Sequence, residues 1–257
     1  MTNQAQTTLA HLTDIHFPQN PSFSMSEISL KRFLGFLNWH LSRKSMHLSK
    51  TLDAISKDVL AQKFDHLIVS GDLVNLSLRK EYEAGLYWMK QFGETSDISF
   101  VPGNHDYYGK NPMLSLNRLE ASQSAGSVGI ASNDGGTLLP YMTSDKQGKV
   151  LGGAEGPDLP FVRVVNDVAL IGINSGIPTP LFKAYGAINK ASLDLLAKIL
   201  SSAQQEGLYR CVVLHHPPLS GITSLSRGLK NDHELTALLE QVGAELVLYG
   251  HNHKQHH

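Results

Sequence analysis

Five short apolar runs in this chain each end in carboxylate, amide or imidazole side chains, and this repeated pattern constrains the fold most. The runs cover residues 7–13, 66–70, 98–101, 210–214 and 245–249. The polar groups that follow them are Asp14-Ile15-His16, Gly71-Asp72, Gly103-Asn104-His105-Asp106, His215-His216-Pro217-Pro218 and Gly250-His251-Asn252-His253. Stretches with helical spacing of apolar residues lie among these runs, at 48–62, 81–92, 191–205 and 232–242.

This alternation of strands and helices predicts an α/β fold, in which crossover connections feed a sheet and helices cover its outer faces. Ligands of such open sheets bind at the carboxyl ends of the strands, so the polar groups are expected to converge there. Two further strands are predicted at 161–165 and 168–174, on either side of the turn signal Asn166-Asp167. The stretch 122–160 is rich in Gly, Ser, Asp and Pro and predicts a long loop near the crevice.

The length of 257 residues suits one large domain, and we expect residues 1–257 to form a single unit. A net charge of -1 provides no basic field, so no nucleic-acid partner is expected. Cys211 is the only cysteine, which excludes an internal disulfide and fits a reducing compartment. The chain shows neither a secretory signal nor a run long enough to cross a bilayer, so a cytoplasmic location is predicted.

The segment at about 18–47 does not fit the strand–helix alternation and is predicted to be an inserted basic amphipathic helix. Five large apolar residues share one helical face, namely Leu30, Phe33, Leu34, Leu37 and Leu41, and positive charge comes from Lys31, Arg32, Arg43 and Lys44. Three interpretations remain open: a helix packed on the core, a cap that touches a membrane surface or an amphiphilic substrate through Leu30 to Lys44, or an oligomer contact.

Each polar group taken alone has an ordinary explanation, such as surface decoration or a turn capped by hydrogen bonds. Taken together, such groups at the ends of five successive strands are not explained by chance decoration. They comprise carboxylates, an amide and several imidazoles, without a thiolate. This set suits first-row divalent metals such as Mn, Fe, Co, Ni or Zn better than Ca or Mg alone. Seven protein groups exceed the needs of one ion, so two divalent metal ions that share a bridging carboxylate are predicted.

The five groups, in this order, resemble the motif set of the calcineurin-like metallophosphoesterases, and most of all its bacterial phosphodiesterase-like members. The resemblance covers almost the whole chain. It implies a four-layer αββα sandwich with two mixed sheets flanked by helices. It also implies that one metal ion binds Asp14, His16, Asp72 and His253, and that the other binds Asp72, Asn104, His215 and His251.

The same resemblance gives His105 the role of contacting the phosphoryl oxygen and protonating the leaving group. Three further residues, Asn75, Asp106 and His216, are expected beside the ligands or facing the substrate. Many relatives have an aspartate at the position of Asn75, where it orients the histidine, so an amide is expected to orient His105 here. Relatives also continue past the last histidine pair with further strands, whereas this chain ends four residues after His253. Part of one sheet or of the pocket wall is therefore expected to be missing.

The predicted chemistry is hydrolysis of a phosphoester. Water held between two divalent cations loses its proton near neutral pH and becomes a nucleophile, and the cations offset charge in the transition state. The favoured activity is that of a phosphodiesterase or pyrophosphohydrolase on a small or lipid-linked phosphoester. A phosphomonoesterase is the nearest alternative, and a metal-binding scaffold without catalytic activity is a third.

Overall fold

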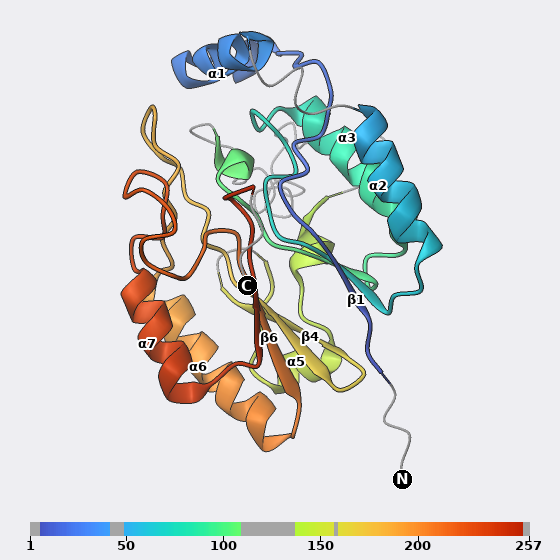
Figure 1. The fold of residues 1–257 in the computed structure, drawn as a ribbon, viewed down its shortest axis with the longest axis vertical. Helices are drawn as coiled ribbons and strands as arrows, with labels where there is room; N and C mark the ends of the chain where they lie inside the picture. The colour runs from blue at the N-terminus through green and yellow to red at the C-terminus, as the bar shows by residue number, and fades with distance from the viewer. Residues whose placement is uncertain (1–5, 42–48, 109–136, 157–158, 254–257) are drawn as a thin grey trace, which may run out of the picture.

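A computed structural model describes residues 6–41, 49–108, 137–156 and 159–253, and arranges them as two β-sheets with helices outside them (Figure 1). The first sheet is parallel throughout and has the order β1 (Leu9–Leu12), β2 (His66–Val69), β3 (Ile98–Phe100). The second is mixed, with an antiparallel first pair, and has the order β4 (Phe161–Val165), β5 (Val168–Gly172), β6 (Tyr209–Val213), β7 (Leu246–Leu248). The predicted fold class, two sheets flanked by helices, is confirmed, but only the second of the two sheets is mixed in the described residues.

Alternation of side chains along the second sheet explains the layering. On β5, Leu170 belongs to the apolar core that also contains Leu67 and Phe100 of the first sheet. Its neighbour Ile171 points the other way, into a second core that it shares with Leu196. Because successive strand residues face opposite sides, one sheet can bury both of its faces, one against the other sheet and one against helices.

Helices cover both outer faces (Figure 1). Beside the first sheet lie α2 (Ser49–Ala61) and α3 (Arg79–Met89), and beside the second lie α6 (Lys190–Gln205) and α7 (Asp232–Val242). Shorter helices are η1 (Met25–Glu27), η3 (Lys90–Phe92), η4 (His105–Tyr107), η6 (Leu139–Met142) and α5 (Lys146–Val150). That residues 1–257 form one domain stays a prediction.

The prediction of a continuous loop over 122–160 is wrong in its second half, where η6 and α5 form. Asp145 precedes helix α5, and its carboxylate accepts a hydrogen bond from the Gly148 amide at 2.6 Å and so caps the helix. Residues 122–136 lie outside the described residues. Among the helices that the structure describes, none has the length and apolarity needed to span a bilayer.

Helix α1 (Leu30–Leu41) forms inside the predicted insertion, but its apolar face is turned outward. Leu30, Phe33 and Leu41 are 70%, 53% and 86% exposed, whereas Gly35 and Trp39 on the inner side are buried. The interpretation that this apolar face packs on the core is therefore wrong. Residues 42–44 lie outside the described residues, and contact of α1 with a membrane, with an amphiphilic substrate or with another protomer stays a prediction.

The inner side of α1 is attached to the rest of the molecule by its cations. Arg32 donates hydrogen bonds to the carbonyl oxygens of Leu76 and Ser77, at 3.0 and 2.7 Å. Lys31 donates to the carbonyl oxygen of Thr179 at 2.7 Å. The charged groups of Lys31 and Arg32 thus face the protein, where these carbonyl oxygens accept their hydrogen bonds.

Candidate metal centre

The backbone at the ends of the strands is left-handed at most of the predicted ligands. Asp14, His16, Asp72, His251 and His253 all have φ between 43° and 73°, and they make up five of the eight non-glycine residues with positive φ in the described chain. Such conformations are sparsely populated for residues other than glycine and persist only where the surroundings hold them. Asp14 and His16 therefore lie beyond the extended strand, since β1 ends at Leu12.

Asp14 and His253 bring together the two ends of the chain. One carboxylate oxygen of Asp14, Oδ2, accepts hydrogen bonds from Thr13 Oγ1 at 2.8 Å and from the His251 amide at 2.9 Å. The other oxygen, Oδ1, lies 3.2 Å from His253 Nε2. The ring of His16 completes this group, in which all potential ligand atoms lie within 4.8 Å of one another.

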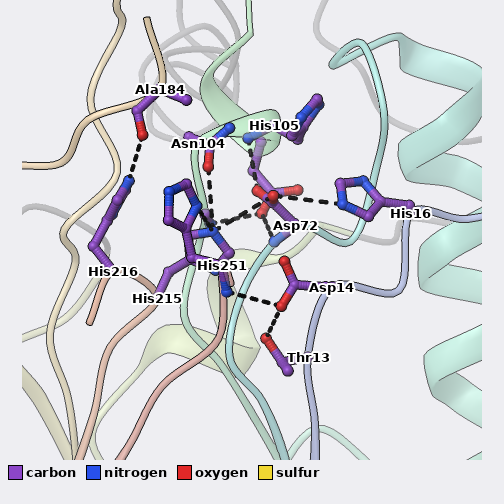
Figure 2. A network of polar contacts seen from close by, with 12 residues as sticks. Thr13, Asp14, His16, Asp72, Asn104, His105, Ala184, His215, His216 and His251 are labelled. Atoms are coloured by element: carbon purple, nitrogen blue, oxygen red, sulfur yellow. Dashed lines mark hydrogen bonds and ion pairs between the residues drawn. The ribbon is translucent and has the colours of Figure 1, made fainter. Parts of the chain in front are cut away.

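Asp72 lies between this group and the remaining imidazoles (Figure 2). Its Oδ1 accepts a hydrogen bond from the His105 amide at 2.7 Å. Its Oδ2 lies 3.6 Å from His16 Nε2 and 3.5 Å from His215 Nε2. A single carboxylate oxygen therefore faces imidazoles from both sheets, which is the geometry expected of a bridging ligand.

On the other side of Asp72 lies a second group, which consists of His215, His251 and Asn104. His215 Nδ1 donates to the Ser70 carbonyl at 2.9 Å, which points its Nε2 into the site. That Nε2 lies 3.3 Å from Asn104 Oδ1 and 3.2 Å from His251 Nδ1. The structure thus brings all seven predicted ligands to one place, although no sequence signal marks Ser70 or Thr13 as the residues that orient them.

Two glycines allow the strand ends to approach this closely. Gly71 has φ of 95°, and a Cβ there would lie 2.5 Å from His215 Nδ1. A Cβ on Gly103 would overlap the Asp72 carboxylate. Any side chain at either position would displace a predicted ligand.

His105 lies beside the ligands and is oriented by the backbone. Its Nδ1 donates to the carbonyl oxygen of Asn75 at 2.5 Å, and its ring stacks on Tyr108 with centroids 5.2 Å apart. The expectation that the side-chain amide of Asn75 orients His105 is therefore wrong, because that amide donates to the Phe17 carbonyl at 3.0 Å. A backbone carbonyl oxygen fixes the orientation of the His105 ring as well as a side-chain acceptor would.

Asp106 and His216 lie next to the ligands and bind protein groups. The buried carboxylate of Asp106 accepts from the amides of Asp72 and Gly103, at 2.9 and 2.8 Å. Burial, and then the charge of Asp72, raise its pKa to about 7. The ring nitrogens of His216 contact Ser175 Oγ at 2.9 Å and the Ala184 carbonyl at 3.2 Å.

Charges in the site are strongly coupled. Burial opposes the ionised form of Asp72, but the neighbouring imidazoles outweigh it and hold the pKa of this carboxyl well below its usual range. Burial likewise opposes the charged form of His215, but Asp72 outweighs it and raises the pKa of this imidazole to about 9. At His251, burial and then the charge of His215 lower the pKa to about 3. A cation is favoured where a carboxylate and several imidazoles meet in this way.

The distances between ligand atoms fit metal coordination. Nitrogen and oxygen ligands about 2.0–2.2 Å from one cation lie roughly 3.0–3.6 Å from each other. The pairs described above, which join Asp14 to His253, Asp72 to His16 and His215, and His215 to His251, lie at 3.2 to 3.6 Å. The donor set contains nitrogen and oxygen and suits a first-row divalent metal.

Two packed sheets gather carboxylate, amide and imidazole side chains at their strand ends, an arrangement that suits a metal-dependent enzyme. The chain belongs to the calcineurin-like phosphoesterases, whose family model matches residues 7–255. It is therefore a metal-dependent phosphoester hydrolase of a family that uses a dinuclear divalent metal centre. A search of curated proteins gave no match.

A solved structure supports the fold. A dimetal phosphatase from Danio rerio superposes on this chain with a TM-score of 0.55 at 12% sequence identity. The alignment covers 96% of this chain and 82% of that chain. At this level of identity the likeness shows a shared fold.

Proposed function

We propose that this hydrolase cleaves phosphodiesters at a dinuclear centre built by the seven predicted ligands. One divalent cation would be held by Asp14, His16, Asp72 and His253, and the other by Asp72, Asn104, His215 and His251. The position of Asp72 Oδ2, 3.6 Å from His16 Nε2 and 3.5 Å from His215 Nε2, supports its role as the bridge. Mn, Fe, Co, Ni and Zn all suit this set of ligands.

The bound cations supply a nucleophile made from water and positive charge for the phosphoryl oxygens. The residues of the chain orient the substrate around this chemistry. His105, held through its Nδ1 by the Asn75 carbonyl at 2.5 Å, would present Nε2 to the phosphoryl group and to the leaving oxygen. General acid catalysis of this kind contributes about 10²- to 10⁴-fold to the rate.

The preference for diesters rests on one observation. A cavity of about 460 Å³ begins at Asn104 and His105, beside the ligands, and extends toward α1. A phosphate bound at the centre could therefore direct a second ester substituent into this cavity, whereas a monoester has no such substituent. A cavity of this size lies within the range of small-molecule sites.

The activity is tested on purified protein loaded with Mn(II). We expect turnover of bis-p-nitrophenyl phosphate to exceed that of p-nitrophenyl phosphate. Clear monoester turnover with little diester turnover would instead identify a phosphomonoesterase. Absence of both activities in protein that binds two metal ions would contradict the proposed function.

The bridge is tested by Asp72→Ala. Because this change removes a ligand from both proposed ion sites, we expect activity and metal content to be lost while the far-ultraviolet circular dichroism spectrum is retained. Asp194→Ala on the exposed surface of α6 is the matched control and should keep both activity and metal. Ordinary turnover by Asp72→Ala would contradict the assignment of the bridge.

A further inference from the structure

The cavity beside the metal centre carries positive charge in a protein whose net charge is -1. Lys31, Lys183 and Arg227 line it, and its described lining contains neither Asp nor Glu. The charges that surround the centre itself include Asp14 and Asp72. The cavity therefore has an electrostatic preference of its own, separate from that of the ligands.

Lys183 and Arg227 lie on two loops that are hydrogen-bonded to each other. The loop that carries Lys183 pairs with the loop that carries Arg227, through the Ala184 amide to the Ser226 carbonyl at 3.0 Å and the Gly186 amide to the Gly228 carbonyl at 3.1 Å. His216 Nε2 contacts the Ala184 carbonyl at 3.2 Å. This wall of the cavity is thus held in place by backbone hydrogen bonds.

Lys31 reaches the cavity from α1. Its ammonium group donates to the carbonyl oxygen and Oγ1 of Thr179, at 2.7 and 3.1 Å, and lies 4.9 Å from the centroid of the Tyr108 ring. An ammonium group has three donors, and these two contacts use two of them. Burial lowers the pKa of Lys31, so a neighbouring anion would stabilise its charged form.

Phe182 adds an aromatic surface at the same cavity. Its side chain is 85% exposed, and its backbone has φ of 61°, an uncommon conformation for a bulky residue. Strained backbone of this kind is concentrated at functional sites, including ligand clamps.

We infer that the cavity binds a substrate substituent that carries its own negative charge, a carboxylate or a phosphate, in addition to the phosphate that is cleaved. Lys183 and Arg227 would contact this anion, Lys31 would face it from α1, and Phe182 would cover its carbon skeleton. This inference rests on the proposed function, because it assumes that the cleaved phosphate is bound at the metal centre.

Three chromogenic diesters that differ in one group provide the test. Each releases p-nitrophenolate, and the other ester group is phenyl, p-carboxyphenyl or p-phosphonophenyl. With Mn(II)-loaded protein, we expect kcat/KM to be higher for both charged diesters than for the phenyl diester. The two charged forms distinguish a site for carboxylate from a site for phosphate. Equal kcat/KM for all three diesters would overturn the inference and leave the proposed function intact.

Substitutions then assign the preference to the cavity. We expect Lys183→Gln to lower kcat/KM for the preferred charged diester about fivefold, the loss typical of one partly solvated charged contact. The value for the phenyl diester should change less than about twofold. Lys198→Gln, which removes an exposed charge from α6, is the matched control. Equal losses on charged and uncharged diesters would overturn the inference.

A binding measurement separates this inference from the catalytic proposal. Mn(II)-loaded protein is titrated calorimetrically at low salt with p-carboxyphenylphosphonate and benzene-1,4-diphosphonate, whose P–C bonds are not hydrolysed. We expect Lys183→Gln to weaken binding of at least one of them several-fold, whether or not the loaded protein is active. Unchanged binding of both compounds would overturn the inference.

Discussion

The backbone is left-handed at five of the proposed ligands, and this conformation raises the free energy of each of these residues. Such conformations cost about 1–3 kcal/mol each outside glycine. Hydrogen bonds from neighbouring strand ends hold them, as where the His251 amide donates to Asp14 at 2.9 Å and the His16 amide donates to the Asp72 carbonyl at 2.8 Å. The conformation turns side chains from different strands toward one point.

His105→Ala tests the role of this imidazole. Because His105 would act on the phosphoryl group without holding a cation, we expect kcat to fall about 10²- to 10³-fold while two metal ions remain bound. Steady-state kinetics and metal analysis of the same preparation measure the two effects. Loss of metal from His105→Ala would instead identify His105 as a ligand.

Single residues also show what the sequence could not predict. The polar groups after the apolar runs correctly predicted that Asp72, Asn104 and His215 are neighbours, because the carboxyl ends of strands meet at one edge. The orientation of His105 by the Asn75 carbonyl was not predictable, since every residue has a carbonyl group and no residue type marks the one that is used.

At the scale of elements, the close approach of α1 depends on a glycine within the helix. Glycine costs about 1 kcal/mol relative to alanine in a helix interior. A Cβ on Gly35 would lie 2.6 Å from Tyr108 Oη and 2.7 Å from Leu76 Cδ2, so a side chain there would push the helix away from the cavity.

Gly35→Val should therefore lower kcat/KM for diesters several-fold while metal content stays unchanged. Leu37→Ala, on the exposed face of the same helix, is the matched control and should retain normal kinetics. Normal kinetics for Gly35→Val would show that the position of α1 does not affect the cavity.

Strands β6 and β7 are joined by an ion pair that makes a separate prediction. Arg210 donates to both carboxylate oxygens of Glu245, at 3.0 Å from Nε and 2.5 Å from Nη2. These hydrogen bonds lower the pKa of Glu245 from 4.5 to about 2. The stabilisation is present above about pH 4.5 and is lost as the pH falls toward 2.

Because the Glu245 side chain is 36% exposed, solvent screening reduces the contribution of this pair. We expect Glu245→Gln to lower the free energy of unfolding by about 1 kcal/mol near pH 7. The difference from the unmodified protein should shrink below about pH 4.5. Urea unfolding at neutral and acidic pH measures both values, and a difference independent of pH would contradict this account.

Element boundaries were predictable where periodicity and turn signals were strong, as for the helix at 232–242 and the hairpin around Asn166-Asp167. The outward orientation of the apolar face of α1 was not predictable. Hydrophobic periodicity shows that a helix has two faces, but the neighbours of Gly35 and Trp39 decide which face is buried.

At the scale of the whole molecule, the proposed ligands come from both sheets. Asp14, His16, Asp72 and Asn104 follow strands of the first sheet, and His215, His251 and His253 follow strands of the second. Bound cations would therefore link the two halves of the sandwich and add their binding free energy to its stability.

Metal affinity should depend on pH because a proton competes with the cation. In metal-free protein, Asp72 outweighs the effect of burial and raises the pKa of His215 to about 9, so His215 keeps its proton at neutral pH. We expect affinity for Mn(II) to rise between about pH 6.5 and pH 8.5, with release of protons on binding. Competition with a chromophoric chelator measures the affinity, and an affinity independent of pH would contradict the prediction.

The candidate metal centre joins Asp14 to His251 and His253. During synthesis, the ribosome delivers the first sheet and its ligands long before the imidazoles of His251 and His253 emerge. A nascent chain that lacks these two side chains lacks one proposed ligand of each cation, so we expect hydrolytic competence to be acquired only after His253 has left the ribosome.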